Sequence, residues 1–291
     1  MDEALARWLA LREPVDAVAR SADLTRALVA TIGTADPFRV LDLATGTGSN
    51  LRYLAERLPD HQRWLAVDRS STLLAKMPAR TAKWASRRGC AVTSETTGFV
   101  VSGERLHCHV EARELDLETL EAVDIFTDRH LVTASALLDL VSVQWLRSLA
   151  SHCRAARAAA LFTITYNGHS ACSPKEPEDE VVLDLFNRHQ RTDKGLGGSA
   201  AGPDAVASAA RCFTEAGHRV RIEPSDWELG AGEPELQRLL IEGWAEAAAE
   251  ISPVEAPIIA DWQVRRIQHV DAGRSRIVVG HDDLAAWPTR T

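Results

Sequence analysis

Short apolar runs alternate with longer amphipathic stretches along the chain, which predicts an α/β fold. The first run, from Phe38 to Leu43, ends in a turn of small residues, and Leu51, Leu54 and Leu58 then line one face of a helix. Further apolar runs predict strands over residues 63–67, 106–110, 131–136, 158–166, 218–222 and 276–279. Strands that alternate with helices form a mostly parallel sheet covered on both faces, so we expect a three-layer, Rossmann-like sheet of seven strands.

Three segments do not fit the minimal alternation of strands and helices. Residues 1–35 carry a helical pattern that Pro14 should break, and we assign them to an N-terminal helical cap. The remaining domain, 36–291, contains insertions at about 167–203 and 229–273, each with at least one amphipathic helix. Long insertions at one end of an α/β sheet often form lids or substrate walls, although helices that only decorate the fold or form a homodimer would give the same pattern.

Composition narrows the classes of partner. The net charge of −8 and the pI of about 5.7 argue against nucleic acid as a partner, and no run of clustered Lys and Arg is apparent. No stretch has the roughly 18 apolar residues of a membrane span, and the charged N-terminus does not resemble a signal peptide, so we expect no membrane association and a cytoplasmic location. The five cysteines are scattered without a CxxC pair, so we expect reduced thiols and no metal site.

The strongest chemical signal is the segment from Val40 to Asn50, in which a strand runs through a small-residue turn into a helix. Gly46 and Gly48 allow the backbone to approach a ligand, and the start of the helix offers free amide groups. Asp68 follows the next predicted strand, where a carboxylate can accept hydrogen bonds from ribose hydroxyls. The pattern predicts a nucleoside-containing ligand, but Leu51 occupies the place of the third glycine in the dinucleotide fingerprint and disfavours a nicotinamide-dependent oxidoreductase.

Asp42 precedes the glycine turn, and with it the sequence resembles the class I S-adenosylmethionine-dependent methyltransferases. Their first motif is an acidic residue followed by alternating glycines, and here it appears as Asp42-x-Ala44-x-Gly46-x-Gly48, with alanine in place of the first glycine. The resemblance continues in order through residues 64–68, 114–117 and 124–140, and covers residues 38–166 best. It implies a class I fold whose last strand, here 276–279, runs antiparallel to the others.

The resemblance also implies a cofactor, S-adenosylmethionine, whose product is S-adenosylhomocysteine, and a set of residues that bind it. In this sequence the expected cofactor-binding residues are Asp42, Ala44, Thr45, Gly46, Gly48, Asn50, Asp68, Arg69, Asp116, Leu117 and Ser135. Asp68 would hold the ribose, and Asp116 with the amide of Leu117 would meet the adenine. Each acid also has a local alternative: Asp42 could cap its turn, Asp68 the helix near Ser70, and Asp116 a short helix after it.

Catalytic residues are harder to predict, because methyl transfer needs a base only when the nucleophile loses a proton. His189 is the first candidate base, since histidine titrates near neutrality, and Asp139 is the second. Tyr166, at the end of a predicted strand, is expected to face the cleft with His189. Arg12 and Arg20 could hold a substrate carboxylate, or could be surface residues. The segment from Lys194 to Pro203 contains four glycines and could open for the acceptor and close over it.

The sequence therefore favours an S-adenosylmethionine-dependent enzyme that methylates a small molecule at oxygen, nitrogen or carbon. An RNA or protein methyltransferase is the alternative within the same class, and no appended RNA-binding module or basic run supports it. A catalytically silent protein that uses the fold for partner contact is the alternative outside it.

Overall fold

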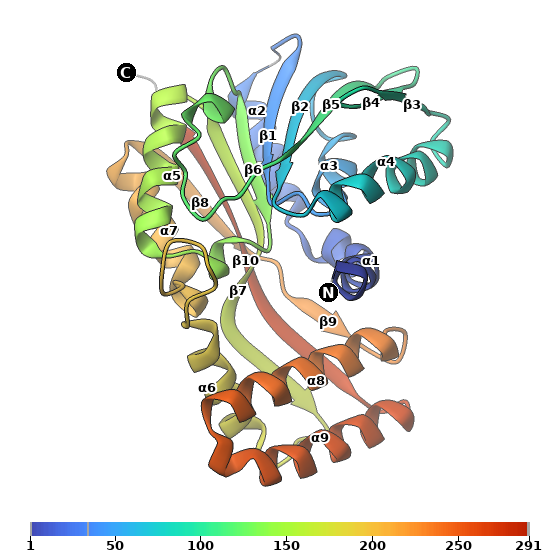
Figure 1. Ribbon diagram of the computed structural model, residues 1–291, viewed down its shortest axis with the longest axis vertical. Coiled ribbons are helices and arrows are strands. Elements are labelled where there is room, and N and C mark those ends of the chain that lie inside the picture. Colours follow the sequence, from blue (N-terminus) through green and yellow to red (C-terminus); the bar gives the residue numbers. More distant parts are fainter. Residues whose placement is uncertain (1, 34, 290–291) are drawn as a thin grey trace.

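The computed structural model describes residues 2–33 and 35–289, which form helices packed around one large sheet (Figure 1). The helices are α1 (Asp2–Ala19), α2 (Ala22–Ile32), α3 (Ser49–Leu54), α4 (Ser71–Ser86), α5 (Val143–Ala156), α6 (Asp179–Gln190), α7 (Ala205–Glu215), α8 (Pro234–Ile251) and α9 (Ala256–Asp271). The strands are β1 (Phe38–Leu43), β2 (His61–Asp68), β3 (Ala91–Glu95), β4 (Gly98–Ser102), β5 (His107–Glu114), β6 (Leu131–Ser135), β7 (Ala159–Ser173), β8 (His218–Pro224), β9 (Trp227–Leu229) and β10 (Arg276–Pro288). Within the described ranges, no helix is long and apolar enough to cross a bilayer.

The strand order confirms the predicted fold class. The order across the sheet is β3-β4-β5-β2-β1-β6-β7-β10-β8, and β9 pairs with β10. Strands β5, β2, β1, β6 and β7 are parallel to their neighbours in this series. The last strand, β10, is antiparallel to β7 on one side and to β8 on the other. Seven of the strands therefore make the expected mostly parallel sheet with a reversed last strand, and three more extend it.

Two hydrophobic clusters make the fold three-layered, because alternate strand residues point to opposite faces of the sheet. Leu41 and Leu43 of β1 pack with α5 and α7 on one face. Phe38 and Val40 of the same strand pack with α2, α3 and α4 on the other face. The carboxyl ends of the parallel strands consequently meet at one edge, where the loop after β1 lies.

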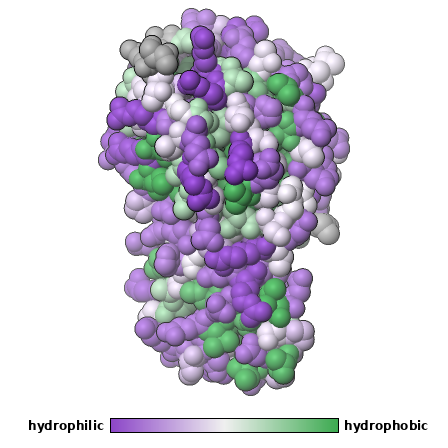
Figure 2. Space-filling model, turned by 90° about the vertical axis from the view of Figure 1, so that its left-hand side faces the viewer, coloured by the Kyte–Doolittle hydropathy of each residue, from purple (hydrophilic) through white to green (hydrophobic). Residues whose placement is uncertain are grey.

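A second part of the molecule, here called the lobe, extends below that edge and comprises residues 170–190 and 227–279 (Figure 1). Strands β7 and β10 run from the main sheet into the lobe, where α6, α8 and α9 cover them. Its core is a separate cluster that includes Trp227, Trp244 and Trp262, and residues of α1 pack against it. Figure 2 shows apolar side chains on the lobe surface, and the exposed large apolar residues of the lobe are Val181, Val254, Ile258, Val264 and Val278.

Several boundaries differ from the prediction. Pro14 does not break the first helix; the chain turns at Arg20 and Ser21, where Ser21 Oγ accepts a hydrogen bond from the amide of Leu24 and caps α2. The region expected as an insertion from 167 begins as a continuation of β7, whose residues up to Ser173 pair with β10. The hairpin β3-β4 and the short β9 were not predicted. Most of β3 is exposed, so it lacks the apolar alternation that signals a strand.

Candidate active site

The turn between β1 and α3 has the backbone conformation that its small residues predict. Ala44, Gly46 and Gly48 have φ angles of 50°, 56° and 81°, in the left-handed region. A Cβ atom at Gly46 would lie 3.1 Å from Leu9 Cδ1, and one at Gly48 would lie 2.6 Å from Met77 Cγ. Glycine is therefore required at Gly48 by both the backbone and the available space, while Ala44 bears the strain that the first glycine of the motif would relieve.

Replacing Ala44 with glycine is expected to leave the free energy of unfolding within about 0.5 kcal/mol of the parent, because relief of left-handed strain offsets the entropy that glycine loses on folding. The matched control is Ala134→Gly in the buried strand β6, where no strain is relieved and a loss of about 1 kcal/mol is expected. Urea denaturation measures both changes. Equal destabilisation by the two substitutions would contradict a strained Ala44.

A buried polar network fixes this turn from below. Asp42 is fully buried and accepts hydrogen bonds from Thr45 Oγ1 (2.5 Å) and Asn50 Nδ2 (2.6 Å). Arg20, from the turn between α1 and α2, donates to Asn50 Oδ1 (3.0 Å) and to Ser135 Oγ (2.8 Å). Burial raises the pKa of Asp42 to about 6, against these hydrogen bonds, which lower it. The network connects the ends of β1 and β6 to the N-terminal helices, so Arg20 braces the turn.

Asp68 lies at the end of β2 beside the same turn. Its Oδ2 accepts a hydrogen bond from the amide of Gly46 (2.8 Å), and its Oδ1 accepts one from the amide of Ser70 (2.9 Å). Ser70 Oγ, and not Asp68, caps α4 by accepting from the amide of Leu73 (3.1 Å). Each carboxylate oxygen can accept a second hydrogen bond, so Asp68 keeps acceptor capacity toward the cavity that it lines.

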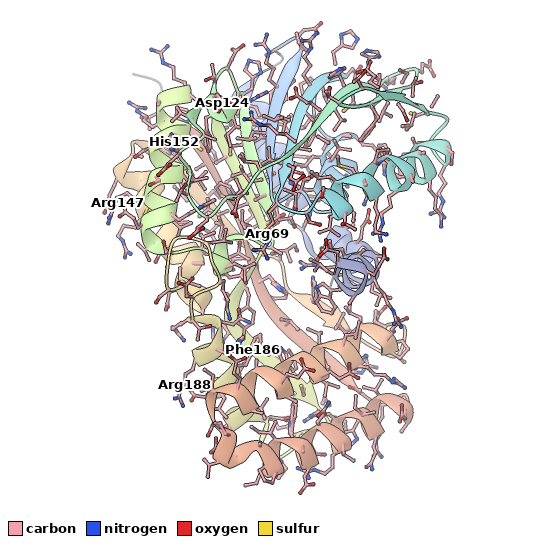
Figure 3. All side chains as sticks on the ribbon, in the orientation of Figure 1. Arg69, Asp124, Arg147, His152, Phe186 and Arg188 are labelled. Carbon is pink, nitrogen blue, oxygen red and sulfur yellow. The ribbon has the colours of Figure 1, made fainter. Side chains whose placement is uncertain are left out.

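A cavity of about 370 Å³ opens at this edge of the sheet. Of the predicted cofactor residues, those in its wall are Ala44, Thr45, Gly46, Asn50, Asp68, Arg69, Leu117 and Ser135. One face of α1 closes the other side with Asp2, Leu5, Trp8, Leu9, Arg12 and Asp16. Figure 3 shows Arg69 at the lower edge of the main sheet, on the side of α1. The sequence motifs, which lie far apart in the chain, are thus brought to one wall.

Three predicted cofactor residues lie outside the cavity wall. Asp42 and Gly48 support the turn from beneath, as described above. Asp116 is exposed, and its Oδ1 accepts a hydrogen bond from the amide of Glu118 (2.8 Å). The short helix that it could have capped does not form, because residues 117–120 are not helical. The neighbouring Leu117 does line the cavity, so this wall is apolar where the adenine is expected.

The structure places the predicted catalytic residues in different surroundings. Asp139 follows β6 and does not itself line the cavity, although its chain neighbours Leu137 and Leu140 do. Its Oδ1 is enclosed without a hydrogen-bond partner among the described residues. Burial raises the pKa of Asp139 to about 6, and the charges of Arg12 and Lys194 lower it in part. An enclosed carboxylate beside two cations is suited to accept a proton near neutral pH.

Tyr166 and His189 do not line the cavity, contrary to the expectation that they face it. Tyr166 is buried and donates from its hydroxyl to Asn187 Oδ1 (2.9 Å), and burial raises its pKa to about 12. His189 Nδ1 lies 3.2 Å from Lys194 Nζ, and Nε2 lies 3.3 Å from a Glu250 carboxylate oxygen. His189 therefore contacts the site through Lys194, because the end of α6 points its ring toward α8.

The side of the cavity that faces the lobe is formed by the glycine-rich loop and by α1, and it includes Arg12, a predicted candidate for a substrate carboxylate. Lys194 and Leu196 come from the glycine-rich loop. The loop is held against the start of α5 by a hydrogen bond from the amide of Ser142 to the carbonyl oxygen of Leu196 (3.1 Å). Arg12 pairs with Asp16 (3.0 Å) and lies over the ring of Trp227 (5.1 Å). Apart from the proposal for Arg12, the helical spacing of Leu5, Trp8, Leu9 and Asp16 predicted an amphipathic helix but not that this face lines the cavity.

Comparisons with known proteins gave matches only among solved structures. No protein-family profile matches the chain, and a search of curated proteins gives no match. Among solved structures, a protein from Bacillus halodurans assigned as a methyltransferase is 17% identical, with 92% of this chain and 100% of that chain covered, at a TM-score of 0.49. A cyclopropane synthase from Mycobacterium tuberculosis is 10% identical, with 91% of this chain and 82% of that chain covered, at a TM-score of 0.46. A Geobacter sulfurreducens S-adenosylmethionine-dependent methyltransferase in complex with S-adenosylhomocysteine is 13% identical, with 93% of this chain and 92% of that chain covered, at a TM-score of 0.43.

The fold itself rests on the strand order and on the turn after β1. A parallel series β5-β2-β1-β6-β7, followed by the reversed β10, is the mostly parallel, Rossmann-like sheet with an antiparallel last strand that the resemblance implied. The fold is therefore the one that the sequence motifs predicted.

Proposed function

We propose that this protein is an S-adenosylmethionine-dependent methyltransferase that acts on a small-molecule acceptor. The observation that carries the proposal is the single cavity wall formed by the turn after β1, Asp68 and Ser135 at the carboxyl edge of the parallel strands. This is where open α/β sheets bind their ligands. A cavity of about 370 Å³ closed by α1 suits small ligands.

The residues of the wall fit S-adenosylmethionine. Leu9 of α1 lies close to Gly46, so a residue without a side chain is needed where the turn meets α1. Asp68 has acceptor capacity for the ribose hydroxyls, and Leu117 offers an apolar surface for the adenine. The cofactor, when bound, supplies an activated methyl group on a positively charged sulfur.

We assign roles on the acceptor side to the polar groups in and next to the remaining wall of the cavity. Trp8, Arg12 and Lys194 line it opposite the turn, and the two cations suit an acceptor that carries a negative or strongly polar group. Asp139 is not in the cavity wall but stands in the chain between the wall residues Leu137 and Leu140, and it is our candidate to take a proton from the acceptor as the new bond to the methyl carbon forms. Much of the rate enhancement would come from holding the acceptor atom in line with the methyl group. His189 then acts by positioning Lys194.

The first test is ligand identity. S-adenosylhomocysteine is expected to raise the melting temperature while NAD leaves it unchanged, because a ligand that binds only the folded state stabilises it. Asp68→Ala should weaken S-adenosylhomocysteine binding by roughly 1–3 kcal/mol through the loss of charge-assisted hydrogen bonds. Isothermal titration calorimetry measures the affinity.

The matched control is Asp60→Ala, which removes an exposed carboxylate just before the other end of β2 and should leave the affinity unchanged. Equal stabilisation by NAD and S-adenosylhomocysteine would refute the methyltransferase assignment. Binding of S-adenosylhomocysteine without any methyl transfer to metabolite extracts would favour the catalytically silent alternative.

A further inference from the structure

A second hollow, here called the basic groove, lies between α1, α3 and α4 and has a volume of about 660 Å³. Seven cationic side chains line it: Arg20, Arg52, Arg57, Arg80, Lys83, Arg87 and Arg88. Only three carboxylates, those of Glu13, Asp16 and Glu56, share the lining. This excess of positive charge stands out in a chain whose net charge is −8.

Each of the three carboxylates already has a cationic partner. Glu13 accepts two hydrogen bonds from Arg52 (2.6 and 2.7 Å), and Glu56 accepts one from Arg88 (2.6 Å). Asp16 pairs with Arg12, which lies outside the groove, and also accepts from Trp227 Nε1 (3.0 Å). Five cations of the groove therefore have no carboxylate ion pair in the described part of the chain: Arg20, Arg57, Arg80, Lys83 and Arg87. Of these, Arg20 is buried and bound to Asn50 and Ser135, so the other four are the ones available to a ligand.

Neutral contacts hold several of the arginines in place. Arg57 lies over the ring of Tyr53 (3.8 Å) and Arg88 over the ring of Trp84 (4.8 Å). Arg80 donates to Thr47 Oγ1 (3.1 Å) and to the carbonyl oxygen of Ala6 (2.8 Å). These contacts orient the guanidinium groups, and those of Arg57 and Arg80 stay without a carboxylate ion pair in the described part of the chain, so less conformational entropy is lost when an anion binds.

We propose that the basic groove binds a phosphate-bearing small molecule with more than one phosphate group, of the size of a nucleotide. Guanidinium groups recognise phosphate oxygens through paired hydrogen bonds, and the volume lies within the range of small-ligand sites. A single-stranded nucleic acid would need free aromatic faces for its bases, but arginines already cover the rings of Tyr53 and Trp84.

The basic groove is separate from the methyl-transfer cavity, although α1 forms a wall of both. Asp16 and Ser49 line both hollows. The free cations Lys83 and Arg87 lie near the end of α4 and line only the groove. The proposal therefore stands or falls independently of the proposed function.

The test is calorimetric titration of the full chain with inorganic pyrophosphate, ATP and tRNA. Pyrophosphate and ATP are expected to bind, and Lys83→Glu and Arg87→Glu should each weaken that binding about tenfold or more, since a favourable charge pair becomes a repulsive one. Arg219→Glu is the matched control, because Arg219 is an exposed cation on β8 at the far edge of the sheet and its replacement changes the net charge equally. The affinity for S-adenosylhomocysteine should be unchanged in all three variants.

Three results would overturn the proposal. The first is the absence of pyrophosphate and ATP binding at millimolar concentration. The second is an equal weakening of that binding by Arg219→Glu. The third is sub-micromolar tRNA binding that the groove substitutions abolish while ATP does not compete, which would identify a nucleic-acid surface instead. Melting curves of each variant confirm that the chain is folded in every titration.

Discussion

Asp139→Asn is expected to lower kcat by about 10²–10⁴-fold for an acceptor that loses a proton, since asparagine keeps the shape of the side chain but cannot take the proton. The affinity for S-adenosylhomocysteine should stay within about twofold, because Asp139 lies outside the cofactor wall. Single-turnover measurement of methyl transfer separates the two quantities.

The pH dependence of the parent enzyme gives an independent readout of the same residue. Burial raises the pKa of Asp139 to about 6, and a base works only in its deprotonated form. The rate should therefore fall about tenfold per pH unit below that value and be level above it. This acidic limb should disappear in Asp139→Asn.

His189→Gln is the control that distinguishes the two candidate bases. Both ring nitrogens of His189 have neighbours, Lys194 on one side and Glu250 on the other, so its replacement should lower kcat by only about threefold through the position of Lys194. A larger loss in His189→Gln than in Asp139→Asn would return the role of base to His189.

Arg266→Ala is expected to lower the free energy of unfolding by about 3 kcal/mol, the largest effect on stability that we predict. Arg266 is fully buried in the lobe, and its side chain donates to Asp179 Oδ1 (3.0 Å) and to the carbonyl oxygen of Pro174 (2.6 Å). Its removal leaves the Asp179 carboxylate with two neutral donors and no cation: Trp262 Nε1 (2.8 Å) and the amide of Glu176 (2.9 Å). An uncompensated carboxylate in a mostly enclosed place is costly.

The adjacent Arg265 provides a control on the same helix. Arg265 pairs with Glu176 and Glu178 but keeps 36% of its side chain exposed, so Arg265→Ala should cost less than about 1 kcal/mol. Urea denaturation followed by circular dichroism measures both variants. A loss for Arg266→Ala no greater than that for Arg265→Ala would contradict the assigned importance of the buried pair.

The cofactor side of the site could be predicted from sequence because it is local. One strand, one turn and one helix, within residues 38–54, contain most of the signal, and Asp68 follows directly on the neighbouring strand. Alternation of apolar positions fixes which residues of β1 point to each layer, and the small residues fix the turn.

The acceptor side could not be predicted, because contacts between distant residues create it. The hydrogen bond between Asp16 and Trp227 Nε1 joins residues 211 positions apart, and it fixes α1 against the lobe. No local pattern indicates that Lys194 lines a cavity or that His189 turns toward Glu250. The continuation of β7 to Ser173 was missed for a related reason: its residues beyond Tyr166 are mostly polar and partly exposed, and their pairing partner, β10, lies about one hundred residues further on.

Helix α1 has a kinetic consequence if the cavity holds S-adenosylmethionine. The helix covers the cavity along its length, and ion pairs hold it at several points: Glu3 to Lys76, Glu13 to Arg52, and Arg7 to Glu235 of the lobe. A bound nucleoside then leaves only as often as these contacts open together. The residence time of the nucleoside therefore depends on how often the helix opens. It also depends on the ionic strength, because salt screens exposed ion pairs. Product release can then limit turnover even when methyl transfer is fast.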